Sequence, residues 1–461
     1  MGDMKKRVEE VLREFYELGL PDDVKDRNVA YLEKRRSATV VVGMRRTGKT
    51  YVAYQRMREL VASGVPLERI VYVNFDDDRL KGLRLEDLRL VGDVHAELYP
   101  SAAKEECWYF LDELQDVEGW ESYARRLLDS RLVRLCLTGS SSKLLSGEIA
   151  TQMRGRSLDV EVFPLSFAEY LRFNGLMKDV PPAPYSSRTA GVLRHAMARY
   201  LDEGGFPDVQ GADYRMRIRM LQGYVDAVLY RDIIERHAVS SVQALGYTLD
   251  YIKRNYAHKI STRAISGALK AVGVSDNREC VADYLDWLTQ AYLIYRVPVR
   301  TDSQAVRRMN PDKYYLVDTG LARAVTPKSD ASKGWLLENL VFLALRRGDN
   351  KIEYYNTKAG AEVDFLVTDA ISHARRLVQV AWELKEDQTV VRELTALRDA
   401  RREIKVRDCT VVTWDSEFET DGIRVVPVWK WILEEGARNA SAPSSLTSDS
   451  NANTNRKETK V

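Results

Sequence analysis

The sequence has few of the side chains that build zinc sites and disulfide frameworks. Its 461 residues include only 4 cysteines and 5 histidines, and neither set has the paired spacing of a zinc site or a disulfide-rich domain. Cys107 and Cys136 lie inside apolar stretches and are expected to be buried thiols. The composition therefore excludes a protein built around structural zinc or disulfides.

Long apolar runs and a strong charge of one sign are also missing. The chain has no apolar run of about 18 residues, and its first residues are charged and lack the apolar region of a signal peptide. We therefore expect a cytoplasmic protein with no membrane partner. The 70 basic and 68 acidic side chains leave a net charge of +2, so any contact with nucleic acid must come from a local basic patch.

A complete phosphate-binding loop follows the first apolar segment. Residues 43–50 come after the β-branched run 38–42 and precede a helical stretch, so backbone N–H groups and the positive helix end can converge on a polyphosphate. Lys49 is expected to contact the β- and γ-phosphates, and the Thr50 hydroxyl to bind Mg²⁺. The residues expected to bind the nucleotide are Gly43, Met44, Arg45, Arg46, Thr47, Gly48, Lys49 and Thr50.

A second apolar strand, 107–111, ends in two acids. A magnesium ion bound to a nucleotide needs a carboxylate at the carboxyl end of a neighbouring parallel strand, and Asp112 has that position. Glu113 is predicted to be the general base that polarises the attacking water. The pair favours hydrolysis over nucleotide binding alone. No Asn-Lys-x-Asp guanine-recognition motif follows the strands, which favours ATP as the nucleotide.

Hydroxyl and guanidinium groups follow the next strand, 132–137. Ser140 is expected to hydrogen-bond the attacking water or the γ-phosphate, although an ordinary serine-rich turn also explains it. Arg154 and Arg156 suit the charge that develops on a transferred phosphoryl group, and a solvated basic loop explains them equally well. If the arginines act on a neighbouring copy, the protein must be a homo-oligomer, which the sequence leaves open.

The order of strands and helices predicts the fold class. Strand and helix patterns alternate from 38 to 165, which indicates a parallel, doubly wound sheet. Three helices between 242 and 291 and a strand at 293–300 outline a winged helix. Such a module reads double-stranded DNA with one helix in the major groove, and packing against a protein partner is the alternative.

Together these motifs resemble the archaeal and bacterial AAA+-type P-loop ATPases whose C-terminal half is a domain of unknown function. The resemblance implies an ATPase core, a winged-helix segment and a terminal fold similar to restriction endonucleases. The segments that carry it, in chain order, are 43–50, 110–115 with Trp120, 137–141, 154–156, 163–167, 204–207, 230–236 and 315–322.

The nuclease chemistry implied by this resemblance needs an acid on a helix, an Asp on one strand and Glu-x-Lys on the next. Glu338 and Asp364 supply the first two, but the expected Glu and Lys positions hold Gln379 and Ala381. The Glu-x-Lys pattern does occur at 383–385, four residues or roughly 13 Å further along a strand. We therefore expect a degenerate site and leave a relocated one open.

The sequence thus predicts an α/β protein that contains a P-loop NTPase sheet. The expected segments are a helical lead-in (1–37), the ATPase core (38–165), a helical lid (166–240), a winged helix (241–305), a degenerate restriction-endonuclease-like domain (306–436) and a disordered tail (437–461). The function expected is Mg²⁺-dependent ATP binding and hydrolysis coupled to double-stranded DNA or a protein partner. An ATP-gated nuclease and a nucleotide-gated scaffold without turnover are the alternatives.

Overall fold

A parallel five-stranded sheet forms the centre of the amino-terminal part of the chain. The computed structural model describes residues 2–31, 37–130, 132–140, 155–274, 278–326, 332–384 and 387–441. The strands have the order β2-β3-β4-β1-β5 and are all parallel. They are β1 (Ala38–Val42), β2 (Ile70–Asn74), β3 (Cys107–Asp112), β4 (Val133–Gly139) and β5 (Ser157–Glu161). The α/β class and the parallel sheet predicted from the sequence are confirmed.

Helices cover both faces of this sheet, which is why its strands are apolar on both sides. Helix α2 (Lys49–Ala62) packs on one face, and α3 (Arg89–Leu98) and α4 (Trp120–Asp129) pack on the other. Helix α1 (Gly2–Leu18) lies against α3 and the edge strand β2 and buries Val8 and Leu12 there. The expected helical lead-in therefore protects a sheet edge that would otherwise be open to pairing.

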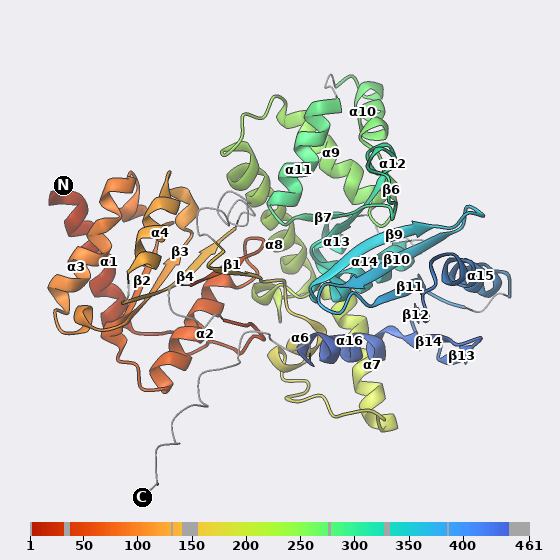
Figure 1. The fold of residues 1–461 in the computed structure, drawn as a ribbon, viewed down its shortest axis with the longest axis horizontal. Helices are drawn as coiled ribbons and strands as arrows, with labels where there is room; N and C mark the ends of the chain where they lie inside the picture. Colours follow the sequence, from red (N-terminus) through yellow and green to blue (C-terminus); the bar gives the residue numbers. More distant parts are fainter. Residues whose placement is uncertain are drawn as a thin grey trace, which may run out of the picture.

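A helical segment connects the core to the remaining modules (Figure 1). It contains α6 (Phe167–Phe173), α7 (Ser187–Glu203) and α8 (Tyr214–Ala227). Helix α8 continues directly into η8 (Val228–Ile234), a turn of π-helix. Residues 228–234 therefore depart from the regular α-helical repeat. Such π turns are rare in proteins as a whole, and those that do occur are often found at functional sites.

Five further helices and a small sheet follow in the described part of the chain. The sheet has the order β6-β8-β7 and is antiparallel throughout. Its strand β8 was expected to lie outside this module, which the sequence ended at 305. The elements are α9 (Val242–Asn255), β6 (Lys259–Ile260), α10 (Thr262–Ala271), α11 (Arg278–Gln290), β7 (Ile294–Val297), α12 (Gln304–Met309), β8 (Asp312–Leu316) and α13 (Thr319–Val325).

The C-terminal part holds a separate six-stranded sheet of order β13-β14-β12-β11-β10-β9. Helix α16 turns back to pack on α6, α7 and α14 and runs past the expected boundary at 436 to Ser441. Residues 442–461, expected to be disordered, lie outside the described residues. The elements are α14 (Ser332–Arg346), β9 (Asn350–Asn356), β10 (Glu362–Asp369), β11 (Arg375–Ala381), α15 (Asp387–Ile404), β12 (Asp408–Thr413), β13 (Phe418–Thr420), β14 (Ile423–Pro427) and α16 (Val428–Ser441).

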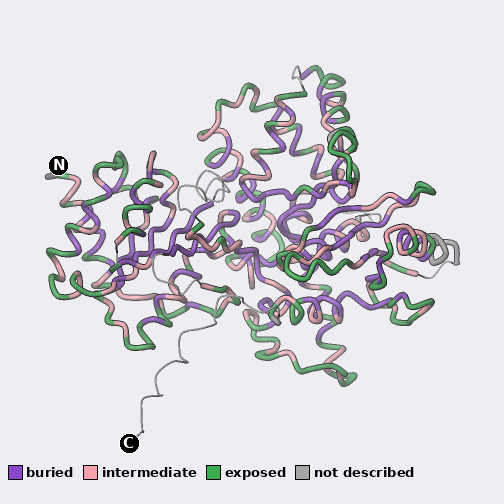
Figure 2. Tube along the Cα trace, viewed as in Figure 1, coloured by how far each residue is buried: buried purple, intermediate pink, exposed green. Residues whose placement is uncertain are grey.

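Burial follows this division into sheets (Figure 2). The buried trace runs along the strands of the core and of the C-terminal sheet, and through α14 between them. Helix α14 buries an almost continuous apolar run from Leu336 to Leu345, interrupted by Glu338 and Asn339. A helix that is apolar around most of its circumference has to be enclosed on several sides. Among the described residues, no helix is long and apolar enough to cross a membrane.

Candidate nucleotide-binding site

The phosphate loop lies between the end of β1 and the start of α2, as expected from the motif. Gly43 has φ +144°, and a Cβ placed there would lie 2.3 Å from the carbonyl oxygen of Val162. Gly48 precedes the helix with φ +94° and no side chain caps the first turn. The two glycines therefore let the chain pass close to β5 and leave the helix amino terminus open to an anion.

Lys49 is buried and points back into the loop. Its Nζ donates hydrogen bonds to the carbonyl oxygens of Gly43 and Met44, both at 3.1 Å, and lies 3.9 Å from Glu113 Oε1. Burial lowers the pKa of Lys49, while the carboxylates of Glu113 and Asp112 act in the opposite direction. A polyphosphate beside Nζ would add to that opposing effect and favour the charged ammonium.

Asp112 and Thr50 meet at the carboxyl edge of the sheet. The Thr50 hydroxyl donates to Asp112 Oδ2 at 2.8 Å, and the Tyr72 hydroxyl donates to the same oxygen at 3.2 Å. Thr138 donates to the other carboxylate oxygen. Burial, followed by the nearby Glu113, raises the pKa of Asp112. A hydroxyl paired with a carboxylate at a phosphate loop is an oxygen donor set that fits Mg²⁺.

Glu113 stands beside this pair with an unusual backbone. Its φ of 55° is left-handed, a conformation that non-glycine residues adopt mainly at turns and functional sites. Its N–H donates to the Thr138 hydroxyl at 3.4 Å, and its carboxylate accepts a bond from Gln115. Burial by itself would raise the pKa of Glu113, but Lys49 and then Arg45 lower it below the ordinary value.

The other predicted site residues have different surroundings. Ser140 is buried, and its hydroxyl donates to Asp232 Oδ1 at 3.2 Å. Arg45 of the phosphate loop donates to the two oxygens of Asp232 at 3.1 and 2.9 Å. Arg236 lies 3.5 Å from Asp232 and donates to Asp116 at 2.9 Å. Asp232, on η8, therefore joins the loop, β4 and the lid in one network.

Arg156 lies at the other end of the sheet. Its carbonyl oxygen accepts from the N–H of Ala38, the first residue of β1, whereas the phosphate loop follows the last residue of that strand. Its guanidinium pairs with Asp129, on the surface end of α4, at 3.0 Å. Arg156 is thus too far from the phosphate loop of its own chain to act there, which corrects the expectation for action in cis. Arg154 lies outside the described residues.

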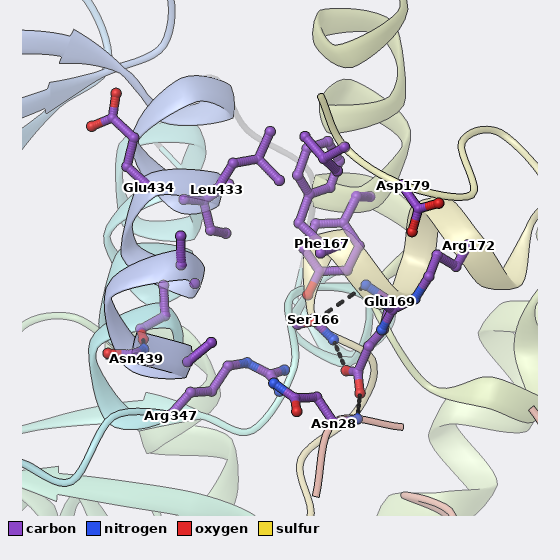
Figure 3. Close-up of a pocket in the computed structure, with 18 of the residues that line it drawn as sticks. Asn28, Ser166, Phe167, Glu169, Arg172, Asp179, Arg347, Leu433, Glu434 and Asn439 are labelled. Carbon is purple, nitrogen blue, oxygen red and sulfur yellow. Dashed lines mark hydrogen bonds between the residues drawn. The ribbon is translucent and has the colours of Figure 1, made fainter. Parts of the chain in front are cut away.

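A cavity of about 900 Å³ lies behind the phosphate loop, between α6 and the helices α14 and α16 (Figure 3). Arg27, in its wall, donates to Glu169 at 2.8 Å and to the carbonyl oxygen of Thr47 at 3.0 Å. Burial alone would raise the pKa of Glu169, but Arg27, with Arg347 and a backbone N–H, lowers it to about 2. Arg27 therefore lines the cavity and also contacts the phosphate loop.

Sequence reasoning missed Arg27, Tyr72 and Asp232. Asp232 lies within 230–236, a segment that carried the family resemblance without a role for any of its residues. Its carboxylate is nearly inaccessible to solvent, at 1% of the side-chain surface. An acid between two isoleucines and an arginine in an amphipathic segment is a signal that a buried ion pair was needed there.

Comparison with known proteins supports this architecture. The chain matches the family described as AAA domain over residues 35–171, and two domains of unknown function, DUF8612 over 194–332 and DUF4143 over 333–431. It is 32% identical over 451 residues to the uncharacterized protein MJ1544 of Methanocaldococcus jannaschii, which covers 94% of this chain and 96% of that protein. The chain belongs to this family of AAA-type P-loop ATPases.

The chain is also similar to a bacterial protein. An uncharacterized protein of Haemophilus influenzae is 29% identical over 398 residues, covering 86% of this chain and 94% of the relative. Solved structures with a similar core include the Aeropyrum pernix Orc1 protein in complex with DNA. Its identity to this chain is 15% and its TM-score is 0.28, and the match covers 70% of this chain and 91% of that chain. AMPPCP-bound DnaA from Aquifex aeolicus has 15% identity, a TM-score of 0.24 and coverage of 61% and 86%. Likenesses this distant carry no argument about ligands.

Proposed function

We propose that the protein hydrolyses ATP in the presence of Mg²⁺. The observation that carries this proposal is the meeting of Thr50, Asp112 and Glu113 beside the buried Lys49. Thr50 and Asp112 would hold the ion, which supplies charge neutralisation at the β- and γ-phosphates when bound. Lys49 would bind the same phosphates.

Glu113 is the proposed general base. Its carboxylate is held ionised by Lys49 and Arg45, and it lies next to the proposed magnesium ligand in sequence and in space. It would orient a water and accept its proton as the water oxygen attacks the terminal phosphorus and the bond from that phosphorus to the bridging oxygen breaks, which releases ADP and phosphate. Gln115, bonded to the carboxylate, is proposed to fix its orientation.

A steady-state ATPase assay with two variants tests this proposal. We expect Glu113→Gln to bind ATP normally and to turn over at least about ten-fold more slowly, because only the proton acceptor is removed. Lys49→Ala is expected to lose tight ATP binding, measured by calorimetry. Normal turnover by Glu113→Gln would move the base to another residue, and unchanged ATP affinity of Lys49→Ala would contradict the phosphate assignment.

Double-stranded DNA binding is the second function that we propose, because the order of α9, β6, α10, α11, β7 and β8 follows the winged-helix pattern. Helix α11 would be the groove-binding helix, but its exposed face carries Glu279, Asp283 and Asp286. DNA phosphates repel such a face. We therefore place the proposed contact on the segment between β7 and β8, which carries Arg300 and Arg307.

The DNA proposal is tested by fluorescence anisotropy on duplex DNA and by the ATPase rate with and without it. The double variant Arg300→Ala, Arg307→Ala should lose several-fold in DNA affinity and flatten the salt dependence. Arg402→Ala, which removes an exposed charge on α15, is the matched control. An ATPase rate indifferent to DNA, together with no duplex binding, would instead favour a protein partner.

A further inference from the structure

Lys313 is almost completely buried, and its ammonium group contacts three carboxylates. Nζ lies 2.9 Å from Glu338 Oε1, 2.6 Å from Glu362 Oε1 and 3.0 Å from Asp364 Oδ1. Its side chain is 2% exposed. A buried ammonium is expensive unless its hydrogen-bond donors all find acceptors, and here each of its three protons has one.

The cation and the acids come from different modules. Lys313 is on β8, in the three-stranded sheet, whereas Glu338 is on α14 and the other two acids are on β10. Lys259 on β6 is the register partner of Lys313 and lies 2.5 Å from Glu362. Two neighbouring lysines of one sheet therefore face three acids of the next module, across the boundary between the two domains of unknown function.

These acids include those that a nuclease of this type would use for its metal. Glu338 is the helix acid and Asp364 the strand acid expected from the sequence. Asp364 lies at an irregularity in the pairing of β10 with β9, a feature that often aims a side chain at a site. The expected metal would lie between these carboxylates, and that position is taken by the ammonium group of Lys313.

The remaining groups at the site are also satisfied from within the protein. Glu338 Oε1 accepts from the Tyr315 hydroxyl at 2.7 Å, and Asp364 Oδ2 accepts from the N–H of Val380 at 2.9 Å. Gln379 accepts from the N–H of Asp364 at 3.1 Å and donates to Glu393 at 2.7 Å. Each of the three acids thus has a partner from within the protein.

Of the alternative metal site suggested by the sequence, the structure describes only Glu383. Strand β11 ends at Ala381, so Glu383 lies beyond it and is exposed, and Lys385 lies outside the described residues. Among the described residues, no three histidine, cysteine, aspartate or glutamate side chains are arranged to hold a metal ion. The residues present therefore do not fit the divalent ion that the nuclease resemblance implies.

We propose that Lys313 is the permanent cation of this carboxylate cluster, in place of a metal, and that the cluster locks the three-stranded sheet to the C-terminal sheet. The C-terminal module is then a fixed part of the ATPase and not a cutting domain. This inference rests on Lys313 and its partners and is independent of whether the phosphate loop hydrolyses ATP.

The electrostatics agree with a resident ammonium. Burial by itself lowers the pKa of Lys313, but the surrounding groups, Glu338 first, raise it well above the ordinary value. Burial and then the neighbouring Asp364 raise the pKa of Glu338. One lysine cannot neutralise three ionised carboxylates, and Lys259, which lies 2.5 Å from Glu362, supplies a second positive charge to the cluster.

Binding of Mn²⁺, measured by electron paramagnetic resonance on the nucleotide-free full chain, tests the proposal. All proteins carry Asp112→Asn, which removes the carboxylate proposed for the phosphate-loop metal. We expect this protein to bind no Mn²⁺ tightly and its melting temperature to be unchanged by a chelator. Adding Lys313→Ala should free the three acids to move together around about one Mn²⁺ per chain, since manganese prefers carboxylate oxygens.

Two controls make the result specific. Lys253→Ala, which removes a lysine paired at 3.1 Å with an exposed acid on α9, should gain no Mn²⁺ site. The site gained by Lys313→Ala should disappear when Asp364→Asn is added. A Lys313→Ala protein that folds without binding Mn²⁺ would overturn the assignment of the cluster as a metal site filled by lysine.

If Lys313→Ala does not fold, measurements on the protein with Lys313 intact still test the proposal. Tight Mn²⁺ binding that Asp364→Asn abolishes, or a melting temperature that falls by several degrees in chelator, would overturn the proposal. So would nicking of plasmid DNA in Mn²⁺ that depends on Asp364. The proposal that Lys313 is the permanent cation is supported if the protein shows no tight Mn²⁺ binding, no chelator effect and no nicking, and if Asp364→Asn loses stability with or without metal. This holds whatever the ATPase assay shows.

Discussion

At the residue scale, the most unusual side chain is Glu113, which has a left-handed backbone and a carboxylate close to two cations. Lys49 lies 3.9 Å from it, and Arg45 also favours its ionised form. A proton acceptor is active when deprotonated, so activity is lost as the pH falls through its pKa in the folded protein. Because that pKa is lowered, the loss should occur below the ordinary glutamate value of about 4.3.

This argument predicts the pH dependence of hydrolysis. The acid limb that Glu113 contributes to kcat/KM for ATP should lie below about pH 5. Removing one of the two cations, in Arg45→Met, should move that limb toward higher pH. An acid limb that Arg45→Met leaves unmoved would contradict the assignment of Glu113 as the base.

At the element scale, η8 is the contact between the lid and the phosphate loop. Asp232 on this π turn binds Arg45 of the loop and lies near Arg236, and the two guanidinium groups are 16% and 19% exposed. In a regular helix, the residues of this turn would point in other directions along the segment. The wider turn thus aims Asp232 at the loop.

Asp232→Ala is predicted to loosen the lid. It leaves the partly buried Arg45 without the acid to which it donates and removes one of the two acids near Arg236, which should cost about 1–3 kcal/mol locally. Amide hydrogen exchange should rise in α8 and η8 and stay unchanged in the C-terminal sheet. The control is Asp208→Ala, which breaks the Arg46–Asp208 pair at 3.7 Å, whose side chains are 64% and 49% exposed, and should have little effect. Equal exchange in both variants would contradict a special role for Asp232.

At the scale of the whole molecule, Glu161 is a point where the core sheet, the three-stranded sheet and the C-terminal module meet. It ends β5 of the core, accepts from the Tyr295 hydroxyl of β7 at 2.7 Å, and accepts from Arg346 of α14 at 2.7 Å. Burial raises the pKa of Glu161, and Arg346 opposes that rise. The modules are therefore connected by a carboxylate that needs its cation.

Arg346→Ala is predicted to weaken this junction by about 2–3 kcal/mol, less than for a fully buried pair because Arg346 is 37% exposed. Calorimetry should show a lower first transition, and limited proteolysis should cut faster between the core and the C-terminal module. Arg438→Ala is the matched control, since its partner Asp408 is 3.9 Å away and both side chains are more than half exposed, at 59% and 52%. Similar losses in both variants would contradict the junction.

The sequence by itself determined the parts of the site that are adjacent in the chain. A β-branched strand, two glycines, Lys49 and Thr50 form a phosphate loop because backbone conformation and local hydrogen bonding decide it. Asp112 comes to Thr50 because parallel strands present their carboxyl ends at one edge, a rule that needs no knowledge of the rest of the fold. The alternation of strands and helices predicted the core sheet for the same reason.

Only the tertiary structure decided which distant charges would meet. Arg156 was placed near the phosphates by its position after β4, but parallel pairing puts the start of β5 at the far end of the sheet. We did not expect a role for Lys313 because the nuclease pattern has its lysine on another strand. It shares its strand face with the buried Tyr315, two residues on, which alternation could have indicated. Its acids follow much later in the chain, and packing of two sheets, which no local pattern encodes, brings them around its ammonium group.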